Sequence, residues 1–165
     1  VWSNDFGGVH TNLGIPNKIL YLVIQGDAHY GVDVPAFSND FDISRGIASN
    51  IWFNWNAYYL GPEDDFSIAR EKMLQACYDL YPNNSSYYQT VSNAWASTGV
   101  GSEFYLGNAN GDSILNIQDI ILILQYVLGN YDLNEFQIFT VDINQDETID
   151  VLDIIQVVNN ILYGI

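Results

Sequence analysis

The sequence predicts an all-α protein in which a small orthogonal helical bundle is followed by two copies of a short loop-helix unit. Two observations predict this. In the first hundred residues, apolar side chains recur at helical spacing in four segments. In the last third, the segment Asn108–Gly129 matches Asp142–Tyr163, 34 residues further along the chain. We therefore expect two domains, residues 1–103 and 104–165.

Each of the four predicted helices has its own signals. The first ends near Ile24, and Pro16 fits one of its early turns. The second runs from about Ile43 to Tyr59, the third from an N-cap at Asp64 to Leu80, and the fourth from about Ser85 to Ser97. The core positions expected of the second helix are Ile47, Ile51, Trp52, Trp55 and Tyr58 or Tyr59. Because the connections are short, the four helices should form a small orthogonal bundle.

The charge balance restricts the partners. Four Lys and Arg residues against twenty Asp and Glu residues give a net charge of −16. This excludes nucleic acid and anionic membranes, which require a basic surface, and favours cations. No basic residue follows Lys72, and no apolar run reaches the length of about 20 residues that spans a bilayer. The start at Val1 shows neither a signal peptide nor an initiator Met, so we expect a processed or excised piece.

The single cysteine, Cys77, lies on an apolar helical face and cannot form an intrachain disulfide. We expect a buried core thiol there.

The repeat places oxygen-bearing side chains at loop positions 1, 3, 5, 9 and 12. They are Asn108, Asn110, Asp112, Asn116 and Asp119 in the first copy, and Asp142, Asn144, Asp146, Asp150 and Asp153 in the second. At position 7, Ile114 or Thr148 would contribute its backbone carbonyl. Calcium takes six to eight oxygen ligands, and a tight loop turns alternate side chains toward it.

A single segment of this kind is usually a solvated turn or a helix N-cap. Two copies in register, each followed by an apolar helical stripe, favour two calcium sites instead. The stripes are Ile120, Ile121, Leu124, Val127 and Leu128, and Ile154, Ile155, Val158, Ile161 and Leu162. The second loop carries four carboxylates and the first carries two, so we expect the second site to bind calcium more tightly.

The pair of loops resembles a type I dockerin, the module that plugs extracellular proteins into cohesin domains. Asp at position 12 and the lack of a helix entering the first loop fit that family, whereas Ser113 and Glu147 replace its usual glycine at position 6. The resemblance implies partner contacts at Ile117, Gln118, Leu124, Gln125, Val151, Leu152, Val158 and Asn159. These positions lack the Lys and Arg common in cellulosomal dockerins. The apolar ones could instead pack against the first half of the chain.

Catalytic motifs are scarce. The chain has two histidines, His10 and His29, and no H-E-x-x-H, G-x-S-x-G or phosphate-loop sequence. However, residues 5–18, DFGGVHTNLGIPNK, resemble the start of the C-terminal helical domain of thermolysin-like zinc metalloendopeptidases. Further matches in register are Gly26–Val32, Tyr59–Pro62, Asp79–Tyr81 and Ala94–Gly101.

This second resemblance implies catalytic roles for His10, which would hydrogen-bond the oxyanion formed on the peptide carbonyl, and for Asp5, which would orient that imidazole. Phe6 stands where Asn is common in the family. His29 matches a non-catalytic position and should be structural. The family's zinc ligands and general base lie upstream of the residues shown here, so this chain cannot bind the catalytic zinc alone.

Two functions remain open. The chain could be the C-terminal part of a secreted metalloendopeptidase that acts on peptides once the zinc-binding half is present. It could instead be a non-catalytic extracellular protein that self-assembles or serves a structural role. A cohesin-like domain, a second copy or the missing protease half could occupy the docking surface. Extracellular calcium levels would fill weak sites, and N-x-S/T sequons at Asn83 and Asn84 agree with secretion.

Overall fold

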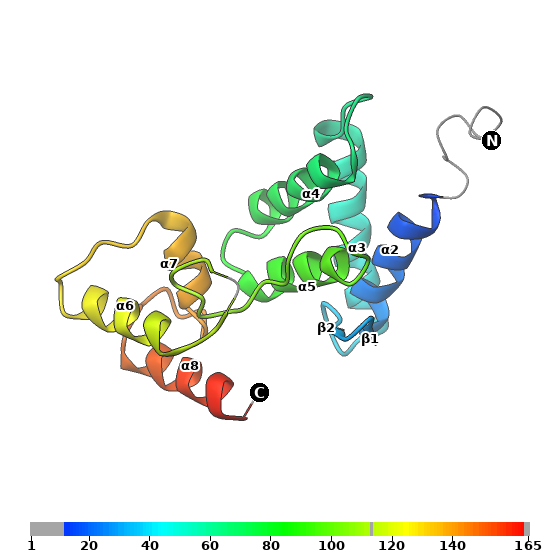
Figure 1. The fold of residues 1–165 in the computed structure, drawn as a ribbon. Helices are drawn as coiled ribbons and strands as arrows, with labels where there is room; N and C mark the ends of the chain where they lie inside the picture. Colours follow the sequence, from blue (N-terminus) through cyan, green and yellow to red (C-terminus); the bar gives the residue numbers. More distant parts are fainter. Residues whose placement is uncertain (1–11, 113, 164–165) are drawn as a thin grey trace. The chain divides into compact units, whose positions relative to one another are not determined.

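The computed structural model describes residues 12–112 and 114–163, and the chain divides into two compact units. Unit 1 comprises residues up to Ala76 together with Thr90–Ser102, and unit 2 comprises Cys77–Gln89 and Glu103–Ile165. Both are mainly helical, as the sequence predicts (Figure 1). No helix in the described part of the chain is long and apolar enough to cross a membrane.

Unit 1 begins with α2 (Gly14–Gln25) and a small antiparallel hairpin that the sequence analysis did not predict. The hairpin pairs β1 (Asp27–His29) with β2 (Val32–Val34), Asp27 standing opposite Val34. Positive φ angles at Tyr30 and Gly31 form the two-residue turn that suits such a hairpin. Strands of three residues are too short to show an alternating pattern in the sequence.

The second predicted helix is divided in the structure. α3 (Phe41–Asn54) begins on the N-cap Asp40, and a π-helical turn continues it over Trp55–Tyr59. Ile51 and Trp55 are buried as predicted, but Tyr58 is 72% exposed. Of the two predicted alternatives, Tyr59 is the half-buried one, because the wider π-turn changes the direction in which successive side chains point.

The third helix, α4 (Phe66–Leu80), begins two residues after the predicted cap. Asp65 accepts the backbone N–H of Ile68 and is the capping residue. Asp64 instead accepts the backbone N–H of Gly61 and a 2.6 Å hydrogen bond from Lys72 Nζ. The hydrogen bond from Lys72 lowers the pKa of Asp64. The cap prediction was therefore wrong by one residue, because Asp64 is held by the turn at Gly61 and by Lys72.

The core of unit 1 surrounds Trp95 on the fourth helix, α5 (Ser85–Ala96). Trp95 is fully buried, its Nε1 donates to the Met73 sulfur at 3.1 Å, and its ring meets Trp55 edge to face at 6.1 Å. Trp55 Nε1 in turn donates to the Ala69 carbonyl. Each buried indole N–H thus has a partner, which large aromatic residues require inside a core.

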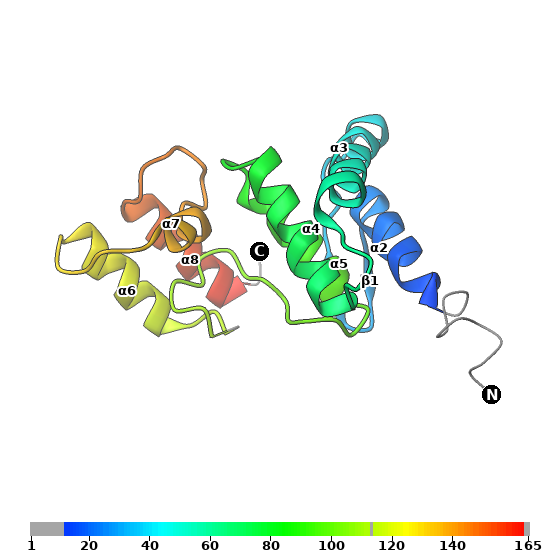
Figure 2. The same cartoon turned by 90° about the horizontal axis from the view of Figure 1, so that it is seen from above.

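Unit 2 combines the end of α4, the start of α5 and the turn between them with α6 (Ile117–Val127), α7 (Glu135–Val141) and α8 (Val151–Tyr163). α6 packs against α8 (Figure 2). The buried core is Ala109, Ile123, Leu133, Val141 and Val157. A Cβ on Gly107 would lie 2.6 Å from Val157, so only glycine fits that position, which also has a positive φ.

The predicted apolar stripes divide between two faces of α6 and α8. Ile120 and Ile154 pack against the core, whereas Ile121 and Ile155 are exposed. The fully buried positions, Ile123 and Val157, lie outside the predicted stripes. Both helices are apolar on nearly all sides, so periodicity in the sequence could not select the inner face.

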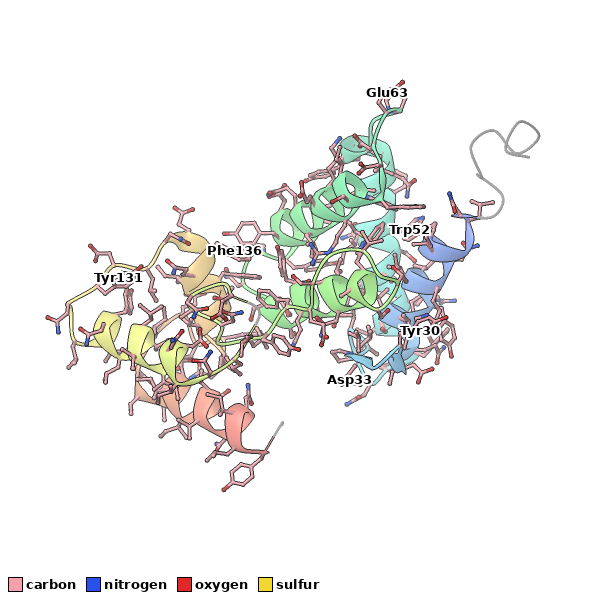
Figure 3. The ribbon with its side chains drawn as sticks, in the orientation of Figure 1. Tyr30, Asp33, Trp52, Glu63, Tyr131 and Phe136 are labelled. Atoms are coloured by element: carbon pink, nitrogen blue, oxygen red, sulfur yellow. The ribbon has the colours of Figure 1, made fainter. Side chains whose placement is uncertain are left out.

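An aromatic cluster holds residues 77–89 to the rest of unit 2. Tyr78 meets Phe139 at 5.1 Å, and Tyr88 meets Phe104 at 5.0 Å and Phe136 at 5.5 Å. Phe136 is labelled in Figure 3. Such edge-to-face pairs stabilise the fold by more than the burial of their apolar area alone would. The two domains 1–103 and 104–165 stay a prediction. These contacts explain why Cys77–Gln89 is grouped with the second unit.

Cys77 is fully buried and free, as predicted, and burial raises the pKa of its thiol to about 12. A thiol with so high a pKa is almost entirely protonated at neutral pH and therefore unreactive.

A first prediction concerns Ser44, whose buried hydroxyl donates to the carbonyls of Val23 and Ile24 and so joins α3 to α2. Replacing Ser44 with Ala should lower the free energy of unfolding by about 1–2 kcal/mol, because buried acceptors lose their donor. Ser49→Ala, an exposed site on the same helix, should change it by less than about 0.5 kcal/mol. Urea denaturation measures both, and equal effects would contradict the assigned role of Ser44.

Candidate functional site

Of the sites predicted from the sequence, the two calcium loops lie within the described residues. The predicted catalytic residues Asp5 and His10 lie outside the described residues, and their roles stay predictions. His29 is half-buried at the end of β1, and its ring contacts Tyr30 at 4.6 Å.

In the first loop, the side chains at positions 1, 3 and 5 accept backbone N–H groups. Asn108 Oδ1 accepts from Gly111, Asn110 Oδ1 from Asp112, and Asp112 Oδ1 from Ile114, at 2.8–2.9 Å. Gly111 supplies a φ of +75° at the bend. The side chains at positions 1, 3 and 5 are therefore held by short-range hydrogen bonds within the loop.

Asp119, at position 12, closes the first loop. Its carboxylate is fully buried and accepts the backbone N–H groups of Asn110 at 3.2 Å and Asn116 at 2.9 Å. Asn116 in turn caps α6 by accepting from Gln118. The amide of Asn116 also donates to the Ile114 carbonyl, which places the position-7 oxygen near position 9.

The second loop repeats this pattern at the equivalent positions. Asp153 is fully buried and accepts from the backbone N–H groups of Asn144 at 3.4 Å and Asp150 at 3.0 Å, which match the two bonds of Asp119. It also accepts from Ile143 at 2.9 Å. Asp150 accepts from Leu152 at the start of α8, and Asp146 accepts from Thr148. The sequence repeat is therefore also a repeat of backbone hydrogen bonds.

The second loop differs from the first in two respects. α7 ends at Val141 and leads directly into it, so this copy has a helix on both sides, which the sequence analysis did not predict. Gln145 and Glu147 also have positive φ values, 59° and 64°. That conformation costs a residue other than glycine about 1–2 kcal/mol. Hydrogen bonds from the Asp146 and Glu147 N–H groups to the Asp142 carboxylate help to hold it.

Negative charge accumulates in the second loop. Burial raises the pKa of Asp142, hydrogen bonds from Glu147 and Asp146 oppose the rise, and the charges of Asp153 and Asp146 add to it. No Lys or Arg follows Lys72 in the sequence to offset these carboxylates. A bound cation would relieve this repulsion.

The donor chemistry of both loops suits a hard cation. Among residues 12–112 and 114–163, no group of three or more His, Cys, Asp or Glu side chains is placed to hold a metal by itself. Each loop would therefore also have to use amide and backbone oxygens, which calcium accepts readily. Positions 3 and 5 already converge, since Asn110 donates to Asp112 at 2.9 Å and Asn144 to Asp146 at 2.8 Å.

The predicted contact positions on α6 and α8 are mostly exposed. Ile117 is 62% exposed, Val151 58% and Leu152 51%, and Leu124 is also exposed. Gln118 is exposed as well, while Gln125, Val158 and Asn159 are half-buried. The charged residues of the two helices are Asp119 and Asp153, both buried, so their outer surface is uncharged and largely apolar.

Comparison with known proteins places the first part of the chain. Bacillolysin from Bacillus caldolyticus and thermolysin from Alicyclobacillus acidocaldarius subsp. acidocaldarius are each 41% identical to it over 98 residues, and neutral protease B from Bacillus subtilis (strain 168) is 33% identical over 98 residues. Each alignment covers 59% of this chain and 17% of the relative, so the chain spans about a sixth of the length of the curated relatives it matches.

The family model for the thermolysin metallopeptidase alpha-helical domain matches residues 1–100, the part that contains α2, the hairpin and α3 to α5. Because this match covers more than half of the sequence and agrees with a mainly helical fold, the chain belongs to the thermolysin metallopeptidase α-helical domain family.

Proposed function

We propose that this chain is the C-terminal part of a secreted thermolysin-like zinc metalloendopeptidase and that it carries a calcium-dependent, dockerin-like docking module. The family match over residues 1–100 is the observation that supports the protease assignment. The equivalent hydrogen bonds in two successive loops support the calcium module. Peptides would be the substrates of the complete enzyme.

In the proposed enzyme, zinc held by the other half would activate water and polarise the peptide carbonyl. His10 donates a hydrogen bond to the oxygen on which negative charge develops. Asp5 accepts from the imidazole and fixes its orientation. Such preorganised donors stabilise the transition state more than the ground state. Catalysis is therefore incomplete without the zinc-binding half.

In the proposed calcium module, each loop binds one ion. The ligands are the side chains at positions 1, 3, 5, 9 and 12 and the backbone carbonyl of Ile114 or Thr148. Asp119 and Asp153 connect each site to its following helix, because both side chains are on the first turn of that helix. Ion binding thus stabilises the arrangement of α6 and α8, and chelation destabilises the C-terminal part more than the bundle.

The uncharged apolar surface of α6 and α8 is the proposed docking surface. A cohesin-like domain is the partner that the dockerin resemblance suggests. A second copy of the chain and the missing protease half are the other partners that such a surface could accept.

The same apolar surface favours a second candidate function, a non-catalytic extracellular protein that self-assembles. Exposed apolar patches often mark protein contacts. This candidate requires no zinc-binding half.

A second prediction concerns calcium. Stepwise titration followed by calorimetry should show two binding events, and Asp146→Ala should abolish the tighter event while Asp112→Ala abolishes the weaker, because the second loop has four carboxylates and the first has two. Asp132→Ala, exposed and outside both loops, is the matched control and should leave both events unchanged. Equal losses in the two loop variants would refute the difference between sites, and an absence of binding would refute the module.

A third prediction concerns His10 in the full-length protein that includes the upstream half. His10→Ala should lower kcat for peptide hydrolysis by about 10²- to 10³-fold with little change in KM, since a transition-state donor is lost. His29→Ala is the control and should retain activity. Zinc content should be unchanged in both variants. Full activity of His10→Ala would contradict the proposed role.

A fourth prediction tests the second candidate function, self-assembly. Sedimentation of the chain in calcium should show a concentration-dependent dimer or larger species that dissociates when EDTA removes the ion, because α6 and α8 lose their fixed arrangement. Ile117→Asp should have the same effect in calcium, by placing a charge on the apolar surface. A monomer under every condition would argue against self-assembly.

A further inference from the structure

Unit 2 contains a pocket of about 280 Å³ that neither the protease assignment nor the calcium module uses. Its walls come from the end of α4, the start of α5 and the turn between them, from α6 and α7, and from the second loop. We propose that this pocket binds the positively charged side chain of a lysine or arginine from a partner polypeptide.

The first argument is charge. Three carboxylates line the pocket, those of Glu135, Asp142 and Glu147, and no basic side chain lines it. Within the described part of the chain, the recorded salt bridges lie elsewhere, at Asp42 and Asp64. If calcium occupies the second loop, Asp142 is neutralised, and Glu135 and Glu147 still leave the pocket negative. A cation is therefore attracted in either case.

The second argument is the aromatic lining, which selects an organic cation over a metal ion. Tyr78, Tyr126 and Phe139 line the pocket, and Tyr78 meets Phe139 edge to face at 5.1 Å. Aromatic faces attract ammonium and guanidinium groups, and they also pack against the methylene chains that carry them. A hydrated metal ion gains little from such walls. Ile138 and Ile149 extend the apolar part of the lining.

The third argument is Ser85, the first residue of α5, which also lines the pocket. Its side chain is 1% exposed, and its hydroxyl oxygen has no hydrogen-bond partner among the described residues. Buried hydroxyl groups are normally paired, so an unpaired one at a pocket wall requires an explanation. The N–H groups of lysine or arginine would give the Ser85 oxygen a donor.

The fourth argument is the weak hydrogen bond now made by Glu147. Asn83 Nδ2 donates to Glu147 Oε1 at 3.3 Å, on an exposed edge of the pocket. A charged donor forms shorter and stronger bonds to a carboxylate than a neutral amide does. An incoming lysine or arginine would therefore replace Asn83 as the partner of Glu147.

The experiment uses the whole chain with methyl-labelled isoleucine, so that Ile138 and Ile149 report on the pocket by NMR. The probes are Nα-acetyl-arginine amide and Nα-acetyl-lysine amide, with the neutral analogues of citrulline and norleucine as controls. At least one charged probe should give saturable shifts at both methyl groups and bind at least about tenfold more tightly than its neutral analogue.

Glu135→Gln should weaken binding at least about fivefold, because it removes a carboxylate that lines the pocket and lies outside the calcium loop. Asp132→Asn makes the same charge change at an exposed residue that does not line the pocket, and it should leave binding unchanged. Tyr126→Leu, which removes an aromatic wall, should also weaken binding and is the second variant if Glu135→Gln fails to fold.

Equal binding of charged and neutral probes would overturn the proposal, as would equal losses in the Glu135 and Asp132 variants. Titration with calcium tests the alternative that the pocket is a metal site. Calcium that displaces the probe from Glu135 would also overturn the proposal. Probe binding that persists in EDTA would support the pocket even if the loops failed to bind calcium. The proposed pocket and the proposed calcium module can therefore be refuted independently.

Discussion

Unit 2 depends on one repeated interaction, a buried carboxylate that connects a loop to the helix after it. Asp119 and Asp153 are each fully buried, and each accepts backbone N–H groups from both sides of its loop. Leaving those N–H groups unpaired, or burying the carboxylate without donors, would cost more than the bond itself contributes. The first turns of α6 and α8 are therefore fixed to the loops, and the apolar core around Ile123 and Val157 joins the two helices.

The aromatic residues around Phe139 bring the turn between α4 and α5 into the same compact unit. This has a functional consequence, because the acidic pocket forms between the second loop and residues 78–85. A segment within the thermolysin-like region thus contributes to a site alongside the repeat. The thermolysin-like region and the acidic repeat each contribute side chains to the lining of this pocket.

The sequence by itself determined the family and most of the helices. The motif from Asp5 to Lys18 and the spaced matches after it pointed to the thermolysin-like helical domain, which the family model over residues 1–100 shows. Strong apolar periodicity located α3 to α5 within a few residues of their ends. The regular spacing of Asp and Asn located both loops, because the hydrogen bonds from backbone N–H groups to these side chains are local. Calcium binding by these residues stays a prediction.

Only the tertiary structure decided the features that depend on contacts between residues far apart in the sequence. The inner faces of α6 and α8 could not be read from helices that are apolar on nearly every side, and only packing selected Ile123 and Val157. α7 has a weak pattern over seven residues and is held by its capping box and the aromatic cluster. The pocket at Ser85 joins residues more than sixty positions apart, such as Asn83 and Glu147, and no local pattern in a sequence records that proximity.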